Sequence, residues 1–213
     1  MFVLVVDDDP IARLTHLALL AKQTELKAVG ASCVQEARRE LEKRPPDVVL
    51  LDMQLPDGNG LEVMSLLDEQ SGYGTNAPMA RVLIVSAQLE PNKPAREANT
   101  RLHKLAKPVQ LRELIQYFRG VALHPVSLAP FALRDYVQLA CAGAHSIRLQ
   151  CSGPEVSGEV LILDGQLWSA RDAHGSGESA FHRLNTSGNR VQASPQDGAR
   201  PPRDLSDDWE RLL

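Results

Sequence analysis

Residues 48–60 read Val-Val-Leu-Leu-Asp-Met-Gln-Leu-Pro-Asp-Gly-Asn-Gly, an apolar run that ends in a carboxylate and then enters a turn. The run is too short for a helix and too uniformly apolar for a strand with one face in water, which is typical of a strand buried in a parallel sheet. Similar runs precede and follow it. We therefore expect five buried parallel strands, at residues 2–6, 26–31, 47–51, 81–86 and 102–106.

Segments with helical spacing separate these runs. Pro10 opens the first, whose expected apolar face comprises Ile11, Leu14, Leu17, Ala18 and Ala21. Further helices are expected at residues 32–44, 60–70 and 109–120. The helix before the last strand should be short or irregular, because Pro91 and Pro94 lie in it and residues 96–101 offer almost no apolar face. This alternation predicts an α/β fold with a doubly wound parallel sheet, whose ligands bind at the carboxyl ends of the strands.

Charged and hydroxyl side chains follow four of the predicted strands. They are Asp7, Asp8 and Asp9 after the first strand, Asp52 after the third, Ser86 at the end of the fourth and Lys107 after the fifth. Because these strand ends meet at one edge of the sheet, we expect one site. Clustered carboxylates need a cation, and Mg²⁺ prefers oxygen ligands. A phosphoryl group would find a positive charge in Lys107, a hydrogen-bond donor in Ser86 and a nucleophile in Asp52.

These motifs carry a resemblance to a known family. Residues 3–10, 48–60, 84–87 and 106–109 resemble the receiver domain of bacterial two-component response regulators, over residues 1–120. The resemblance implies that Asp52 is the phosphoacceptor and that a sensor histidine kinase or phosphotransfer protein is the donor. A homodimer is compatible with it. It also implies a site made of Asp7, Asp8, Asp52 and the main-chain carbonyl of Gln54 for Mg²⁺, and of Ser86 (switch hydroxyl) and Lys107 for the phosphoryl group.

Other residues near this site have less direct interpretations. We interpret Asp9, Asp57 and Asn59 as loop and helix-cap residues. The family commonly has an aromatic residue three positions before the Lys-Pro dipeptide, where this chain has Lys104. In the family, the aromatic residue at this position transmits phosphorylation to a surface that commonly forms a dimer. Lys104, together with Pro91 and Pro94, departs from the features on which that transmission and that dimer depend.

The remainder of the chain predicts a second domain. Residues 123–130 are rich in turn formers, including Pro125 and Pro130, and we expect residues 121–129 to link the receiver to a smaller α+β domain at residues 130–213. We expect helices from Pro130, at 178–184 and from about 205, and strands at 146–150, 155–163 and 166–170, with Asp164-Gly165 as a hairpin turn. Residues 126–200 resemble the PATAN-type domain found attached to bacterial receivers. That resemblance implies a protein-interaction module without catalysis.

Charge and composition limit the partners. The 213 residues have a formal net charge of −4, and residues 121–213 contain no lysine, with eight arginines against eleven acidic residues. This balance does not favour nucleic acid or an anionic membrane surface. No apolar run approaches the roughly 20 residues that cross a bilayer. The three cysteines are widely spaced, without the pattern of a disulfide framework, so we expect a cytoplasmic protein.

Two classes of function follow. The first is a response regulator of a two-component phosphorelay, in which phosphorylation of Asp52 changes how the second domain meets an unidentified downstream protein. The alternative is a DNA-binding transcriptional response regulator with a divergent output domain. An effector enzyme ranks third, because no nucleotide-binding signature occurs and the histidines of the second half are isolated, at His124, His145, His174 and His182. Beyond its own phosphoryl transfer and hydrolysis, the chain is not expected to be an enzyme.

Overall fold

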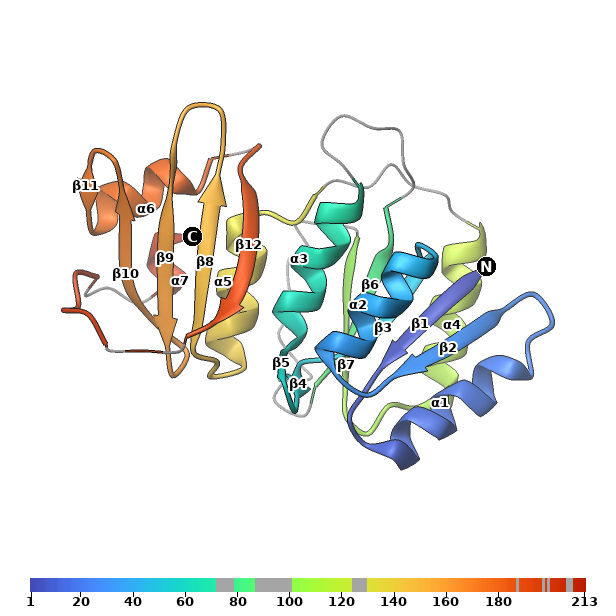
Figure 1. Ribbon diagram of the computed structural model, residues 1–213. Helices are drawn as coiled ribbons and strands as arrows, with labels where there is room; N and C mark the ends of the chain where they lie inside the picture. The colour runs from blue at the N-terminus through green and yellow to red at the C-terminus, as the bar shows by residue number, and fades with distance from the viewer. Residues whose placement is uncertain are drawn as a thin grey trace. The chain divides into compact units, whose positions relative to one another are not determined.

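Figure 1 shows the protein as a computed structural model. The structure describes residues 1–71, 79–86, 101–123, 130–186, 188–196, 198, 200–205 and 209–213. Contacts divide the chain into two units, one of Met1–Val63 and Glu69–Ala129 and the other of Met64–Asp68 and Pro130–Leu213. Each unit has its own sheet.

The described part of the first unit has a five-stranded parallel sheet in the order β2-β1-β3-β6-β7. Its strands are β1 (Phe2–Val6), β2 (Lys27–Ala31), β3 (Val48–Asp52), β6 (Arg81–Ser86) and β7 (Leu102–Ala106). The predicted doubly wound α/β class is therefore confirmed. The chain leaves β1 first to one side, toward β2, and then to the other, toward β3. Ligands of such sheets bind at the carboxyl ends of the strands beside this reversal.

Helices cover both faces of this sheet (Figure 1). They are α1 (Pro10–Ala21), α2 (Val34–Lys43), α3 (Gly60–Ser71) and α4 (Leu111–Leu123), and a hairpin of β4 (Gln54–Leu55) and β5 (Gly58–Asn59) connects β3 to α3. Leu20 of α1 and Leu114 and Phe118 of α4 pack against Val5 and Leu50 of the sheet in one core cluster. Alternate strand residues face the other helices, because strand side chains alternate between the two faces.

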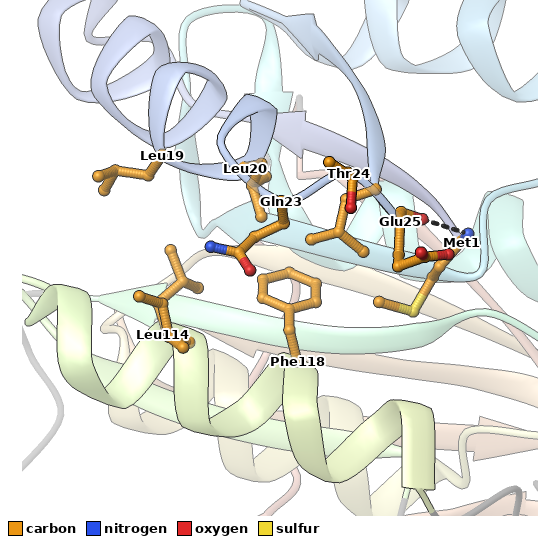
Figure 2. A pocket seen from close by; sticks show the side chains of 10 residues that line it. Met1, Leu19, Leu20, Gln23, Thr24, Glu25, Leu114 and Phe118 are labelled. Atoms are coloured by element: carbon orange, nitrogen blue, oxygen red, sulfur yellow. Dashed lines mark hydrogen bonds between the residues drawn. The ribbon is translucent and has the colours of Figure 1, made fainter.

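A cavity of about 400 Å³ lies at the amino ends of β1 and β2. Figure 2 shows Leu114 and Phe118 of α4 on one side of it and Leu19, Leu20 and Gln23 on the other. It is therefore at the opposite edge of the sheet from the carboxyl ends of the strands.

Three expectations about the first unit need correction. β2 and β7 are only half-buried, because the strand order places them at the two edges of the sheet. Ile11 and Leu14 of α1 are 76% and 66% exposed, since the buried side of the helix is the one that carries His16 and Leu20. The last helix of this unit, α4, spans Leu111–Leu123 instead of the expected residues 109–120. Apart from Arg101, the helix expected around Pro91 and Pro94 lies outside the described residues, and so do residues 124–129 of the expected linker.

The second unit contains an antiparallel sheet in the order β11-β10-β9-β8-β12. Its elements are α5 (Leu133–Ala142), β8 (Ile147–Ser152), β9 (Ser157–Leu163), β10 (Gln166–Asp172), β11 (Gly175–Ser176), α6 (Glu178–Leu184), β12 (Arg190–Pro195) and α7 (Trp209–Leu212). Tyr136 of α5 and Phe181 of α6 are fully buried in its core. The predicted α+β class of this part is confirmed.

Local chemistry explains the turns and ends of this second unit. Asp164 and Gly165 connect β9 to β10 with φ angles of 51° and 73°, the left-handed conformations that an Asp-Gly hairpin turn requires. Helix α5 begins at Leu133 rather than at Pro130, because the Asp135 carboxylate accepts a hydrogen bond from the Ala132 N–H at 2.8 Å and so caps the helix there.

Among the residues that the structure describes, no helix combines the length and apolar character needed to cross a membrane.

Candidate functional site

Three carboxylates converge at the carboxyl ends of β1 and β3. Asp7 and Asp8 follow β1, Asp52 ends β3, and one carboxylate oxygen from each lies within 4.8 Å of the others. Asp7 and Asp52 are buried, whereas Asp8 is exposed to solvent. In the described residues, no other group of three or more His, Cys, Asp or Glu side chains that could hold a metal ion meets this closely.

The backbone of the acidic segment is held in place by α1. The Arg13 guanidinium on this helix donates hydrogen bonds to the carbonyl oxygens of Asp7, at 2.5 Å, and Asp8, at 3.3 Å. Asp9 accepts from the N–H groups of Ile11 and Ala12 and therefore caps α1. Arg13 belongs to none of the motifs described above. Its position in the first turn of the helix after the acidic triplet was the available signal.

Lys107 is the cation of this site. Its Nζ atom lies 2.5 Å from Oδ2 of Asp52 and 3.9 Å from Oδ2 of Asp7. Burial alone would lower the pKa of Lys107, but the hydrogen bond to Asp52 and the negative charges of Asp52, Asp7 and Asp8 outweigh it and raise this pKa. The ammonium is therefore fully charged at neutral pH.

Ser86 and Gln54 lie next to this cluster. Ser86 pairs with Ala106 across β6 and β7, and its carbonyl accepts a hydrogen bond from the Lys107 N–H at 2.9 Å. The Gln54 N–H donates to Oδ1 of Asp52 at 3.2 Å. The structure thus brings Asp7, Asp8, Asp52 and Lys107 into one cluster and places the backbones of Ser86 and Gln54 beside it.

The electrostatics of the cluster favour a bound cation. Burial raises the pKa of Asp7, and the nearby Asp52 raises it further, against the lowering effects of Lys107 and of the Asp9 N–H. Three carboxylates face one ammonium, so negative charge is in excess. Hard oxygen donors with excess negative charge are what Mg²⁺ requires, and the set of Asp7, Asp8 and Asp52 is consistent with Mg²⁺ binding.

The charges of this cluster also act on a buried histidine that lies outside the sequence motifs. His16 on α1 is 8% exposed. Burial lowers its pKa, while Asp7 acts to raise this pKa and Lys107 to lower it. His16 is therefore neutral at physiological pH and adds no positive charge to the cluster.

The other two residues interpreted as caps do cap helices. Asn59 accepts a hydrogen bond from the Leu61 N–H at 2.9 Å at the start of α3, and its own N–H donates to Glu62. Asp57 caps a helix distant in sequence, α2, through the N–H groups of Val34 and Gln35.

Of the histidines in the second half, His182 lies 3.5 Å from Glu178, and His124 lies outside the described residues.

Comparisons with known proteins identify a family for the first part of the chain. A family model described as the response regulator receiver domain matches residues 3–119. An "Uncharacterized response regulatory protein" of Vibrio cholerae is 31% identical over 149 residues, which are 68% of this chain and 60% of that protein. The "Sensory transduction protein LytT" of Bacillus anthracis is 47% identical over 66 residues, 30% of this chain and 27% of that protein.

Among solved structures, the response regulator domain of Thermotoga maritima CheB is similar to part of this chain. The match has a TM-score of 0.47 and 26% identity, and it covers 59% of this chain and 98% of that domain. The chain spans between about a quarter and three fifths of the length of the two curated relatives above.

Proposed function

The chain belongs to the response regulator receiver family, and from this membership we propose that Asp52 accepts a phosphoryl group from a sensor histidine kinase or a phosphotransfer protein. Histidine kinases are the partners of receiver domains. A receiver-domain response regulator is not a classical enzyme, because what it catalyses is the transfer of a phosphoryl group to itself and the hydrolysis of that group.

One observation carries this proposal. Asp52 is buried among two further carboxylates, and the Lys107 ammonium lies 2.5 Å from it. A buried carboxylate with both an ammonium and an oxygen-rich cation site beside it is suited to nucleophilic attack on phosphorus. Catalysis of phosphoryl transfer consists mostly of positioning the reactants and of stabilising charge on the phosphoryl oxygens.

The proposed step moves the phosphoryl group directly from the donor's histidine to Asp52. A carboxylate oxygen of Asp52 attacks phosphorus, the bond from phosphorus to the donor's histidine nitrogen breaks, and that nitrogen keeps the electron pair. The product is an acyl phosphate on Asp52. Lys107 then pairs with a phosphoryl oxygen, and the Ser86 hydroxyl donates a hydrogen bond to another. Mg²⁺, held by Asp7, Asp8, Asp52 and the main-chain carbonyl of Gln54, would supply positive charge to the phosphoryl oxygens.

A protein donor must dock close to Asp52. Ile11 and Leu14 expose large apolar side chains on α1, directly after the acidic segment. Exposed apolar side chains beside a reactive site support docking of a protein rather than reaction with small donors only. We therefore assign the donor's contact surface to the first two turns of α1.

The second unit would deliver the output. We assign it to the PATAN-type interaction modules. Its partner would then be an unidentified downstream protein, and not nucleic acid or a membrane. The lysine-free, net negative composition of residues 121–213 supports this. We also propose that the protein is cytoplasmic. A second copy of the chain is a further proposed partner. Salt-dependent DNA binding by the full chain would instead indicate a transcriptional regulator.

Acetyl phosphate with Mg²⁺ tests the assignment of Asp52. We expect intact-mass spectrometry to show one added phosphoryl group on the wild type and none on Asp52→Asn. Asp47→Asn is the matched control, because Asp47 is a carboxylate directly before β3 that accepts a hydrogen bond from the Phe2 N–H at the opposite edge of the sheet. Labelling of Asp52→Asn at the wild-type level would disprove the assignment.

A further inference from the structure

Asp57 lies at the tip of the hairpin that follows Asp52. The hairpin pairs Gln54 with Asn59 and Leu55 with Gly58, which leaves Pro56 and Asp57 as its turn. The Asp57 carboxylate accepts hydrogen bonds from a different element, the start of α2. Its Oδ1 accepts a hydrogen bond from the Val34 N–H at 2.7 Å and its Oδ2 one from the Gln35 N–H at 2.9 Å.

These two bonds satisfy the first turn of α2. Cys33, the N-cap of that helix, accepts through its sulfur from the Glu36 N–H at 3.4 Å, so the N–H groups of Val34 and Gln35 depend on Asp57. The positive end of a helix favours a carboxylate. Burial would raise the pKa of Asp57, but the hydrogen bonds from Gln35, Val34 and Cys33 outweigh it and lower this pKa. The Asp57 carboxylate is therefore charged at all physiological pH values.

The base of the same hairpin is attached to the candidate site. The Gln54 N–H donates to Asp52, and the Gly60 N–H donates to the Met53 carbonyl at 3.0 Å. Backbone packing is tight, because a Cβ at Gly60 would lie 2.8 Å from the Asp52 carbonyl oxygen. A Cβ at Gly58 would lie 3.0 Å from the Val34 side chain. The hairpin is thus held at its base by Asp52 and at its tip by α2.

We propose that Asp57 is a positioning residue of the phosphorylation site. By holding the tip of the hairpin against α2, it sets the orientation of the Gln54 backbone beside Asp52, and with it the affinity of the site for Mg²⁺. The inference rests on the function proposed above for Asp52 and Gln54. It also makes the start of α2, which supplies none of the assigned site residues, part of the support of the site.

A purely structural role for Asp57 predicts something different, and the chain offers a matched control. The Asp47 carboxylate accepts a hydrogen bond from the Phe2 N–H at 2.5 Å, across 45 residues and at the opposite edge of the sheet. Asp47→Ala therefore removes a comparable tie between distant backbone segments without touching the site. General destabilisation would lower Mg²⁺ affinity in Asp57→Ala and Asp47→Ala alike. Loss of the Asp57 charge alone would make Asp57→Asn and Asp57→Ala equally weak, whereas a positioning role leaves Asp57→Asn, which keeps one acceptor, between Asp57→Ala and the wild type.

The experiment titrates the full chain with Mg²⁺ alone by isothermal calorimetry, and in parallel measures acetyl phosphate labelling at increasing Mg²⁺. We expect Asp57→Ala to weaken Mg²⁺ binding about tenfold, as removal of a residue that orients metal ligands typically does. Excess Mg²⁺ should bring its labelling back toward the wild-type rate. Asp57→Asn keeps one acceptor oxygen and should lie between. Asp47→Ala should bind Mg²⁺ as the wild type does, even if it unfolds at a lower temperature.

Equal Mg²⁺ affinity of Asp57→Ala and the wild type would overturn the proposal. So would an equal loss of affinity in Asp47→Ala, because the effect would then follow general destabilisation. If Asp57→Ala does not fold, Asp57→Asn decides by the same comparison. Failure of the proposed function is distinguishable: the wild type would take no label or Asp52→Asn would keep it, whereas the calorimetric comparison still reports on Asp57.

Discussion

The ammonium of Lys107 and the carboxylate of Asp52 are 2.5 Å apart, although 55 residues separate them along the chain. Each residue stands at the end of its own strand, β7 and β3, and β6 lies between those strands in the sheet. Lys107 is thus a counterion for a buried carboxylate that has Asp7 as its neighbour. The ammonium lies where a phosphoryl group on Asp52 would need a positive charge.

Replacing this counterion should separate metal binding from phosphorylation. Lys107→Met keeps the length of the side chain but removes its charge. We expect Mg²⁺ to bind severalfold more tightly, since an ion pair of about 1 kcal/mol no longer competes for the carboxylates. Labelling by acetyl phosphate should fall sharply. Calorimetry and intact mass measure the two effects, and undiminished labelling would contradict the role given to Lys107.

Burial of Asp7 predicts a specific pH dependence of stability. Its pKa is raised in the folded protein, so its contribution to stability is full below the ordinary value of 3.8 and is lost as the pH rises through the raised pKa. In EDTA at neutral pH, Asp7→Asn should therefore unfold at a higher temperature than the wild type. The difference should vanish as the pH falls below 3.8. Thermal unfolding over a pH series tests this, and a variant less stable at neutral pH would refute it.

The exposed residues of α1 should matter only for a protein donor. Ile11→Ser with Leu14→Ser should slow transfer from a phosphorylated histidine kinase about tenfold, the loss expected when apolar contacts of an interface are removed. Acetyl phosphate labelling and thermal stability should stay near wild type, because both side chains face solvent. Leu213→Ser, at another exposed apolar residue, is the control. Equal slowing with both donors would argue against docking on α1.

The cavity beside Phe118 should limit how much stability is lost when this side chain is shortened to alanine. Phe118 is 5% exposed and packs with Leu20 and Leu114. Phe118→Ala should cost about 3 kcal/mol, the lower end of the usual range for such a change, because one side of the ring already faces the cavity (Figure 2). Urea unfolding followed by circular dichroism measures this cost. A loss well above 5 kcal/mol would mean that the cavity is filled in solution.

Strand ends were the most predictable features of this chain. The limits of β1, β6 and β7 coincide with the predicted ones. For β1, the apolar run stops where Asp7 begins the acidic segment. The approach of Asp7, Asp8, Asp52 and Lys107 followed from the rule that parallel strands share a carboxyl edge. The exposure of Ile11 and Leu14 was not predictable, because helical spacing alone does not say which side of α1 faces the sheet.

By itself, the sequence determined which segments form strands and which chemical groups stand at their ends, since both depend on residues adjacent in the chain. Only the tertiary structure decided which of these groups face one another. It placed Lys107 closer to Asp52 than to Asp7, Arg13 against the backbone of the acidic segment, and Asp57 on α2. The Lys107 and Asp57 contacts join residues more than 20 positions apart. They exist because packing of the helices and the sheet brings those residues together, and no local sequence pattern encodes that packing.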